Sequence, residues 1–446
     1  MNLHRLLLQR QAAGEPIRVG LIGCGKFATM FLAQARLTPG LHVQAVADLD
    51  PGRARANMLA AGWPAERLGA ESAADAVRTG ATWLTEDVGA VIGAEGVDVV
   101  VEATGDPLVG AVHAARSIDA GHNVVMVNVE ADVLCGPALA ARAARAGTVY
   151  SLAYGDQPAL IAELVDWART VGLDVVAAGK GTKYLPSYHY STPDTVWEHY
   201  GLTAEQARAA GMNAKMFNSF LDGTKSAIEA AAVANATGLG VQEKGLGFPP
   251  CGTRRLPHLL RPEGEGGRLE RAGVVEIVSS LERDGGPVED DLRWGVYVTF
   301  AAPSDYTARC FAEYGLVTDP EGRTSALWRP YHLIGLELGV SVASAALRRE
   351  PTGAPRGWVG DVAAAAKRDL APGEVLDGEG GFCVYGRLLP AARARAVGAL
   401  PLGFSKGAIL ARPVAKDAVL TMADVTLDVP AEVQALRNET LAMLAR

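Results

Sequence analysis

Apolar and polar positions in the first 150 residues alternate between short apolar runs and longer stretches with helical spacing. The runs predicted to be strands are 17–23, 42–47, 98–105 and 122–129, and the predicted helices include 26–38, a long stretch after Asp48, 107–120 and 137–146. Strands that alternate with helices of this length are typical of a parallel, doubly wound sheet. We therefore expect residues 1–150 to form an α/β domain of the Rossmann type, which binds a dinucleotide.

The pattern changes after residue 150. The predicted elements are a helix at 158–171, a strand at 175–178, an irregular loop at 180–200, strand-like runs at 273–280, 294–300 and 308–313, and a helix at 331–348. A long helical region is predicted at 203–236, and a break at Gly211 is left open. We interpret 151–350 as an α+β domain for catalysis, substrate binding and oligomer contacts. A Pro/Gly-rich linker at 351–357 precedes short strands and turns, which we assign to a small third domain at 358–446.

Composition narrows the class of protein. The 446 residues carry a net charge of −8, which gives no basic surface for nucleic acid or anionic lipid. The five cysteines are scattered without a CxxC pair, so a disulfide framework or a thiolate zinc site is not expected. No apolar stretch reaches the ~18 residues of a membrane span. We expect a cytoplasmic protein with a small-molecule substrate and no dedicated metal, although a loosely held divalent ion on Asp156, Asp194 or Asp222 stays open.

A glycine-rich turn follows the first predicted strand. Gly23-x-Gly25-x-x-Ala28 opens the next predicted helix, and Asp48 ends the second strand 20 positions later. Gly23 permits the tight turn, Gly25 lets the backbone approach a diphosphate, and Ala28 allows close packing of helix and strand. Lys26 and Phe27 complete the turn and are expected to line the same cofactor.

Asp48 decides which nicotinamide cofactor we expect. A carboxylate at the end of the second strand accepts hydrogen bonds from ribose hydroxyls and repels a 2′-phosphate, so NAD is preferred. Arg53 and Arg55 lie just beyond and can bind such a phosphate, which keeps NADP open. The ends of the next two strands should also approach the cofactor, through Ala103, Thr104, Gly105, Asn128 and Glu130. The alternative for Glu130 is a role in capping a helix.

Two lysine-rich segments of the second domain are the catalytic candidates. Lys180 and Lys183 lie close together at a strand end, on glycine-rich backbone that we expect to be flexible, with His189 in the loop that follows. Asp222, Lys225 and Glu229 are expected on one helix face, next to an alanine-rich stretch too apolar for a solvated helix. A lysine with a lowered pKa can exchange a hydroxyl proton during hydride transfer. The alternatives are a solvent-exposed basic turn for Lys180 and Lys183, and a surface ladder of ion pairs for the second segment.

These residues resemble a known family. The runs 127–132, 178–181, 222–225, 234–239 and 329–333 are similar to the homoserine dehydrogenase-like superfamily, and more closely to 1-deoxy-D-xylulose 5-phosphate reductoisomerase-like oxidoreductases. Residues 362–429 resemble an SAF domain, a small β-clip module, through 367–374, 403–406 and Asp424. The resemblance implies chemistry at a sugar-derived carbonyl or alcohol, in some members coupled to isomerisation, and favours Lys180, Lys183 and Lys225 as catalytic.

The sequence departs from that family in two places. Its reductoisomerase members use NADPH, whereas Asp48 favours NAD, and the loop at 184–194 differs from theirs. We therefore expect an oxidoreductase for another polyhydroxylated substrate, a sugar phosphate, sugar acid or polyol, in a homo-oligomer by analogy with related second domains. The alternatives are reductoisomerase or homoserine dehydrogenase activity itself, and a non-catalytic protein that senses a nucleotide or sugar.

Overall fold

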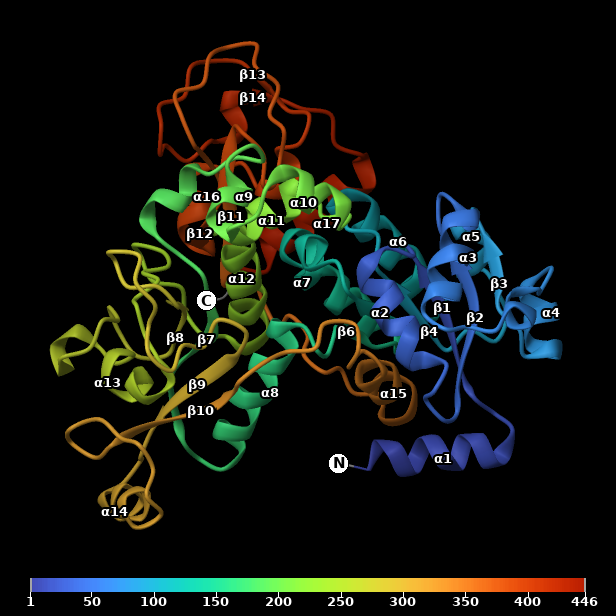
Figure 1. The fold of residues 1–446 in the computed structure, drawn as a ribbon, viewed down its shortest axis with the longest axis horizontal. Coiled ribbons are helices and arrows are strands. Elements are labelled where there is room, and N and C mark those ends of the chain that lie inside the picture. The colour runs from blue at the N-terminus through green and yellow to red at the C-terminus, as the bar shows by residue number, and fades with distance from the viewer. Residues whose placement is uncertain (1, 445–446) are drawn as a thin grey trace. The chain divides into compact units, whose positions relative to one another are not determined.

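The computed structural model describes residues 2–444, which form two compact units. The first unit contains residues 2–160, 333–355 and 432–439, and the second contains 161–332, 356–431 and 440–444. Figure 1 shows the elements of both.

The first unit is built on a six-stranded sheet in the order β3-β2-β1-β4-β5-β6, with every neighbouring pair parallel. The strands are β1 (Ile17–Ile22), β2 (Leu41–Ala47), β3 (Trp83–Thr85), β4 (Val99–Glu102), β5 (Asn123–Met126) and β6 (Tyr150–Leu152). The strand order reverses between β1 and β4, and ligands of such sheets bind beyond the carboxyl ends of the strands at this point. The expected Rossmann-type sheet is confirmed.

The helices of this unit follow the strands as the sequence predicts, with local differences. They are α1 (Leu3–Ala13), α2 (Lys26–Ala35), α3 (Pro51–Ala60), α4 (Ala73–Thr79), α5 (Val88–Ile92), α6 (Pro107–Asp119), α7 (Val129–Ala146) and α15 (Gly339–Arg348), with most of α17 (Ala431–Ala442). The long helix expected after Asp48 is wrong, because α3, α4 and α5 are separated by turns and by β3. The helix expected at 331–348 begins only at Gly339.

The second unit contains a mixed sheet in the order β10-β9-β7-β8. Its strands are β7 (Asp174–Thr182), β8 (Val274–Ser279), β9 (Val296–Ala301) and β10 (Thr324–Arg329), and only the β7–β8 pair is parallel. β7 is longer than predicted and includes Lys180. The strand expected at 308–313 is wrong, because these residues belong to helix α14 (Asp305–Glu313), which Ser304 caps by accepting a hydrogen bond from the Thr307 amide.

Several further helices belong wholly or mostly to the second unit. They are α8 (Gln157–Thr170), α9 (Val196–Tyr200), α10 (Ala204–Ala209), α11 (Ala214–Leu221), α12 (Thr224–Thr237) and α13 (Leu256–Leu259). The helical region expected at 203–236, with a possible break at Gly211, is three helices, and Gly211 lies in the gap between α10 and α11. Every residue of α12 except Lys225 is buried, and α12 contacts strands of two different sheets, β8 and the C-terminal β11 and β12.

The C-terminal part of the second unit is made of short strands and turns, as expected. β11 (Gly360–Ala366) pairs antiparallel with β12 (Val384–Pro390), and β13 (Ile409–Leu410) pairs antiparallel with β14 (Val425–Thr426). Helix α16 (Ala391–Val397) follows β12 directly. Its assignment to an SAF domain stays a prediction.

Candidate functional site

The turn after β1 has the geometry of a phosphate-binding loop. Gly23 has a φ of +88°, and a Cβ atom there would lie 2.7 Å from the carbonyl oxygen of Ala103, so only glycine fits. A Cβ atom on Gly25 would meet nothing within 4 Å. Gly25 also provides the N-cap of α2 without a side-chain hydrogen bond. The first amides of α2, including those of Lys26 and Phe27, are therefore available to an anion in front of the helix.

Asp48 lies beside this turn and is 7% exposed. One carboxylate oxygen accepts a hydrogen bond from the Cys24 amide at 2.8 Å, and the other accepts from the Asp50 amide at 2.9 Å and the Arg53 guanidinium at 2.7 Å. Burial alone would raise the pKa of Asp48, but these donors more than offset it and hold the pKa below its ordinary value. Asp48 is thus an ionised carboxylate whose charge Arg53 partly compensates, and the preference for NAD stays a prediction.

The end of β4 holds a carboxylate that the sequence analysis did not select. Glu102 is fully buried, and its Oε1 accepts from the Thr104 hydroxyl at 2.5 Å and lies 3.5 Å from Nδ1 of His113. Gly105 has a φ of +76°, which glycine adopts without strain. An acidic residue at the end of an otherwise apolar strand was the signal for Glu102 in the sequence.

Asn128 joins the start of α7 to the turn after β4. Its side-chain oxygen accepts from the Ala131 amide at 3.0 Å, and its side-chain nitrogen donates to the carbonyl of Asp106 at 2.8 Å. Asn128 is therefore the N-cap of α7, while Glu130 lies half-buried in the first turn. Whether either residue contacts a cofactor stays a prediction.

Lys180 and Glu229 form an ion pair inside the second unit. Lys180 comes from β7 and Glu229 from α12, and their side chains are 8% and 3% exposed. The expectation of flexible glycine-rich backbone around Lys180 is wrong. A Cβ atom on Gly179 or Gly181 would overlap the carbonyl oxygen of Glu276 or Leu292, respectively. The glycines therefore allow close packing of β7, which holds Lys180 in one place.

Asp222 belongs to a second buried ion pair. The sequence placed Asp222 on one helix with Lys225 and Glu229, but α12 begins at Thr224, so Asp222 precedes it. The Asp222 carboxylate accepts from the Thr224 amide at 2.9 Å and lies 2.8 Å from Nζ of Lys367. Burial raises the pKa of Asp222, although Lys367 opposes that rise.

Lys367 enters this site from the C-terminal strands, directly after β11. Its ammonium also donates to the carbonyl oxygens of Ser191 at 2.7 Å and Gly381 at 2.8 Å, and the side chain is 2% exposed. The sequence analysis used Lys367 only for the resemblance to an SAF domain. No local pattern links it to Asp222, so its role is visible only in the structure.

The other two candidate lysines, Lys225 and Lys183, have different surroundings. Lys225 is the one residue of α12 that is not buried, and it lies one turn before Glu229 on the same helix face. Lys183 donates to the carbonyl of His199, and burial together with Arg293 lowers the pKa of its ammonium group. The structure thus brings Lys180 and Glu229 into contact, and gives Lys183 a separate backbone partner.

His189 uses both ring nitrogens within the protein. Nδ1 lies 2.7 Å from the Asp222 carbonyl and Nε2 lies 2.9 Å from the Tyr184 hydroxyl. A carbonyl can only accept, so Nδ1 carries the hydrogen and Nε2 accepts from Tyr184. Burial lowers the pKa of His189, which makes the ring neutral at pH 7.

The described residues contain neither a cluster of metal ligands nor a helix that could span a membrane. Residues 2–444 contain no group of three or more His, Cys, Asp or Glu side chains arranged to hold a metal ion. None of the helices in this range is both long and apolar enough to cross a lipid bilayer.

Comparisons with known proteins give one family match. Residues 155–338 match the family described as oxidoreductase DRL, catalytic domain, and this segment includes Lys180, Lys183, Lys225 and Glu229. No curated protein matches the chain.

Solved structures match at low identity. A 3-ketoreductase from Actinomadura kijaniata, solved with NADP, is 19% identical over 38% of this chain and 50% of its own, with a TM-score of 0.25. A homoserine dehydrogenase from Thiobacillus denitrificans is 18% identical over 50% and 49%, with a TM-score of 0.35. A myo-inositol dehydrogenase from Lactobacillus casei, solved with NAD(H) and myo-inositol, is 16% identical over 41% and 50%, with a TM-score of 0.28.

The chain thus spans about half the length of these solved proteins. At this level of similarity they do not extend the assignment beyond the family match. Residues 155–338 are therefore similar to the catalytic domain of the DRL oxidoreductases.

Proposed function

We propose that this protein is an NAD(P)-dependent oxidoreductase that acts on a CH–OH group, or the matching carbonyl, of a polyhydroxylated sugar-derived substrate. The observation that carries the proposal is the open space at Gly25, in front of an uncapped helix start and beside the ionised carboxylate of Asp48. The match of residues 155–338 to an oxidoreductase catalytic domain supports the reaction type. The substrate class follows from the family resemblance of the sequence.

The residues around Gly25 fit a dinucleotide. The amides of Lys26, Phe27 and Ala28 would hold the diphosphate, since an α-helix leaves its first amides without partners. Asp48 would accept the ribose hydroxyls, and Arg53 beside it would contact a 2′-phosphate if one is present. When bound, the nicotinamide exchanges a hydride with the substrate carbon.

In the proposed reaction, lysines of the second unit transfer the proton of the substrate hydroxyl and orient its oxygen. Lys225 is the residue of α12 with solvent access, so it takes or returns the proton of the substrate hydroxyl. Lys180 is fixed by Glu229, and its ammonium group donates a hydrogen bond to the substrate oxygen and orients it. Lys183 holds the polar end of the substrate by hydrogen bonding. His189, whose two ring nitrogens are engaged with Asp222 and Tyr184, has no substrate role in this proposal.

The test is a panel of polyols, sugar acids and sugar phosphates, assayed with NAD and NADP in parallel by the absorbance of reduced nicotinamide. We expect turnover with at least one substrate, and a loss of about 10²–10⁴-fold in kcat for Lys225→Met. Lys215→Met is the control, because Lys215 is an exposed lysine of α11 outside this site.

Two results would overturn the proposal. A Lys225→Met enzyme with unchanged kcat and raised KM would remove the proton-transfer role from Lys225. Tight binding of a nicotinamide dinucleotide without turnover of any substrate would instead indicate a sensing protein.

A further inference from the structure

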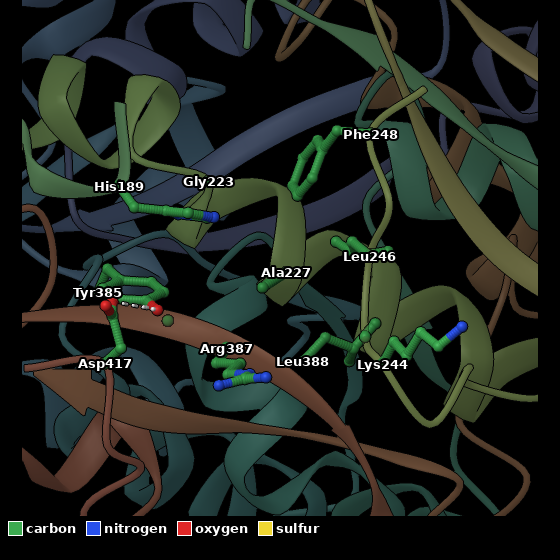
Figure 2. Close-up of a pocket in the computed structure, with 12 residues that line it drawn as sticks. His189, Gly223, Ala227, Lys244, Leu246, Phe248, Tyr385, Arg387, Leu388 and Asp417 are labelled. Atoms are coloured by element: carbon green, nitrogen blue, oxygen red, sulfur yellow. Dashed lines mark hydrogen bonds between the residues drawn. The ribbon is translucent and has the colours of Figure 1, made fainter. Parts of the chain in front are cut away.

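The second unit contains a cavity of about 230 Å³ that the proposed reaction does not use. It is lined by the start of α12, the loop 244–248 and strand β12, and by His189 and Asp417 from two further segments. Figure 2 shows the residues that the argument needs, His189, Ala227, Phe248, Tyr385, Arg387 and Asp417. The volume lies below the range of about 300–1,000 Å³ for pockets of drug-sized ligands, so it fits a small molecule rather than a dinucleotide.

This cavity lies on the opposite side of α12 from the Lys180–Glu229 pair. Gly223 and Ala227 line the cavity and are four positions apart, so they share one side of the helix. Lys225 and Glu229 are each two positions further on, which is about 200° around a helix with 3.6 residues per turn. The cavity is therefore separate from the lysines proposed to act on the substrate.

Arg387 makes the cavity suitable for an anion. Its guanidinium is half-buried, and within residues 2–444 it forms no hydrogen bond or ion pair. A half-buried guanidinium without a partner can pair with an anion that enters the cavity. The start of α12 does not add to this charge, because the Asp222 carboxylate already accepts from the Thr224 amide, so Arg387 is the group that favours an anion.

The other walls of the cavity suit a carbon skeleton with hydroxyl groups. The rings of His189 and Tyr385 stack with centroids 4.5 Å apart, and their surfaces can pack against C–H groups. Asp417 accepts hydrogen bonds from the Tyr190 hydroxyl at 2.9 Å and the Tyr385 hydroxyl at 3.5 Å, and its carboxylate can accept further ones from a ligand. His189 offers only its ring face, because both nitrogens are already engaged.

The cavity is formed in advance on the side of the loop 244–248. The buried carboxylate of Glu276 accepts hydrogen bonds from the amides of Gly247 at 3.0 Å and Phe248 at 3.3 Å. Gln242 donates to the same carboxylate at 2.7 Å. These bonds hold the loop in place without a ligand, which lowers the entropic cost of binding.

We propose that this cavity binds a small hydroxylated organic anion, a sugar acid or sugar phosphate, at a site distinct from the reaction centre. The anionic group pairs with Arg387 near the start of α12, and the hydroxyl groups bond to Asp417 and Tyr385. β12 and the turn that holds Asp417 belong to the C-terminal part of the second unit, so that part completes a binding site. This inference does not depend on the proposed redox activity.

The test is calorimetric titration of the full chain, without nicotinamide, using gluconate, sorbitol 6-phosphate, sorbitol and inorganic phosphate. We expect gluconate or sorbitol 6-phosphate to bind at least tenfold more tightly than sorbitol or inorganic phosphate, and the tighter of the two identifies the anionic group. Arg387→Gln and Ala227→Leu should each remove one equivalent of this binding. Lys225→Met, on the opposite helix face, should retain it.

Protein stability provides the check on folding. The Arg387 side chain forms no hydrogen bond or ion pair within the described residues, so Arg387→Gln should leave Tm unchanged without ligand, and Arg387→Lys should keep part of the affinity. Binding that is equal for sorbitol and its phosphate, or that survives both Arg387→Gln and Ala227→Leu, would overturn the proposal. Equal affinity for inorganic phosphate would overturn the role of the hydroxyl groups.

Discussion

Replacing Lys367 by methionine tests the buried pair that joins the C-terminal strands to the Asp222 turn. Lys367 donates to Asp222, Ser191 and Gly381, and the two charged side chains are 2% and 0% exposed. Methionine has similar length, so it fills most of the space. It removes the ammonium that pairs with the buried Asp222 charge, although the Thr224 amide still donates to Asp222 and the Asn218 side chain still donates to the Ser191 carbonyl.

The expected cost follows from the burial of Asp222. Removing one partner of a buried ion pair destabilises a protein by about 3–5 kcal/mol, because the remaining charge is left uncompensated. Each ~1.4 kcal/mol is tenfold, so the unfolding equilibrium constant should rise about 10²–10⁴-fold. The double variant Asp222→Asn/Lys367→Met leaves no buried charge, and should recover part of this loss.

The effect should also depend on pH. Burial raises the pKa of Asp222 in the folded protein, and loss of Lys367 removes the group that opposes that rise. A carboxyl whose folded-state pKa is raised favours folding while protonated, and this contribution is lost as pH rises through the folded-state value. Lys367→Met should therefore be more destabilising at pH 8 than at pH 5.

Urea denaturation followed by circular dichroism measures these differences. Arg254→Met is the matched control, since its pair with Asp290 at 3.2 Å is exposed and should contribute only about 0–1 kcal/mol. The reasoning would be refuted if Lys367→Met cost less than the control at pH 8, or if the double variant were less stable than the single one.

Two further substitutions test other parts of the structure. Gly179→Ala should cost about 3 kcal/mol or more in a urea titration, because the new Cβ would overlap the Glu276 carbonyl; a cost below 1 kcal/mol would show that β7 can shift. Burial raises the pKa of Asp132 from 3.8 to about 7. The free energy of unfolding of the wild-type protein, relative to that of Asp132→Asn, should therefore fall by about 1.4 kcal/mol per pH unit between pH 3.8 and pH 7. Above pH 7 this difference should stay constant. A pH-independent difference between these two proteins would contradict the burial of an ionisable Asp132.

The Rossmann-type sheet could be predicted because its strands are buried on both faces. Such strands contain continuous apolar runs, as at 99–101, and several helix starts are marked by glycine, aspartate or proline, as at Gly25 and at Asp106-Pro107. β3 lacks this signal, since its three residues are only half-buried. α14 has one buried residue, Phe311, among polar neighbours, so its last six residues resembled a short exposed strand.

Some residues of the candidate sites could be identified from the sequence, and others could be identified only in the structure. Gly23, Gly25 and Asp48 belong to a local pattern whose spacing reflects one turn and one strand–helix unit, so sequence alone identifies them. The pairing of Asp222 with Lys367 joins residues far apart in the chain, and no periodicity encodes it. The glycines around Lys180 illustrate a second limit, because composition indicates flexibility where the structure has close packing.

The proposed function requires that a dinucleotide binds in front of α2. Isothermal titration of the purified protein with NAD and NADP measures this binding. A side chain at Gly25 has free space, so Gly25→Asp should fold with unchanged Tm, but its carboxylate would repel the diphosphate. We predict saturable binding of at least one dinucleotide to the wild-type protein and none to Gly25→Asp. Absence of binding to the wild-type protein, or equal binding to the folded variant, would contradict the account.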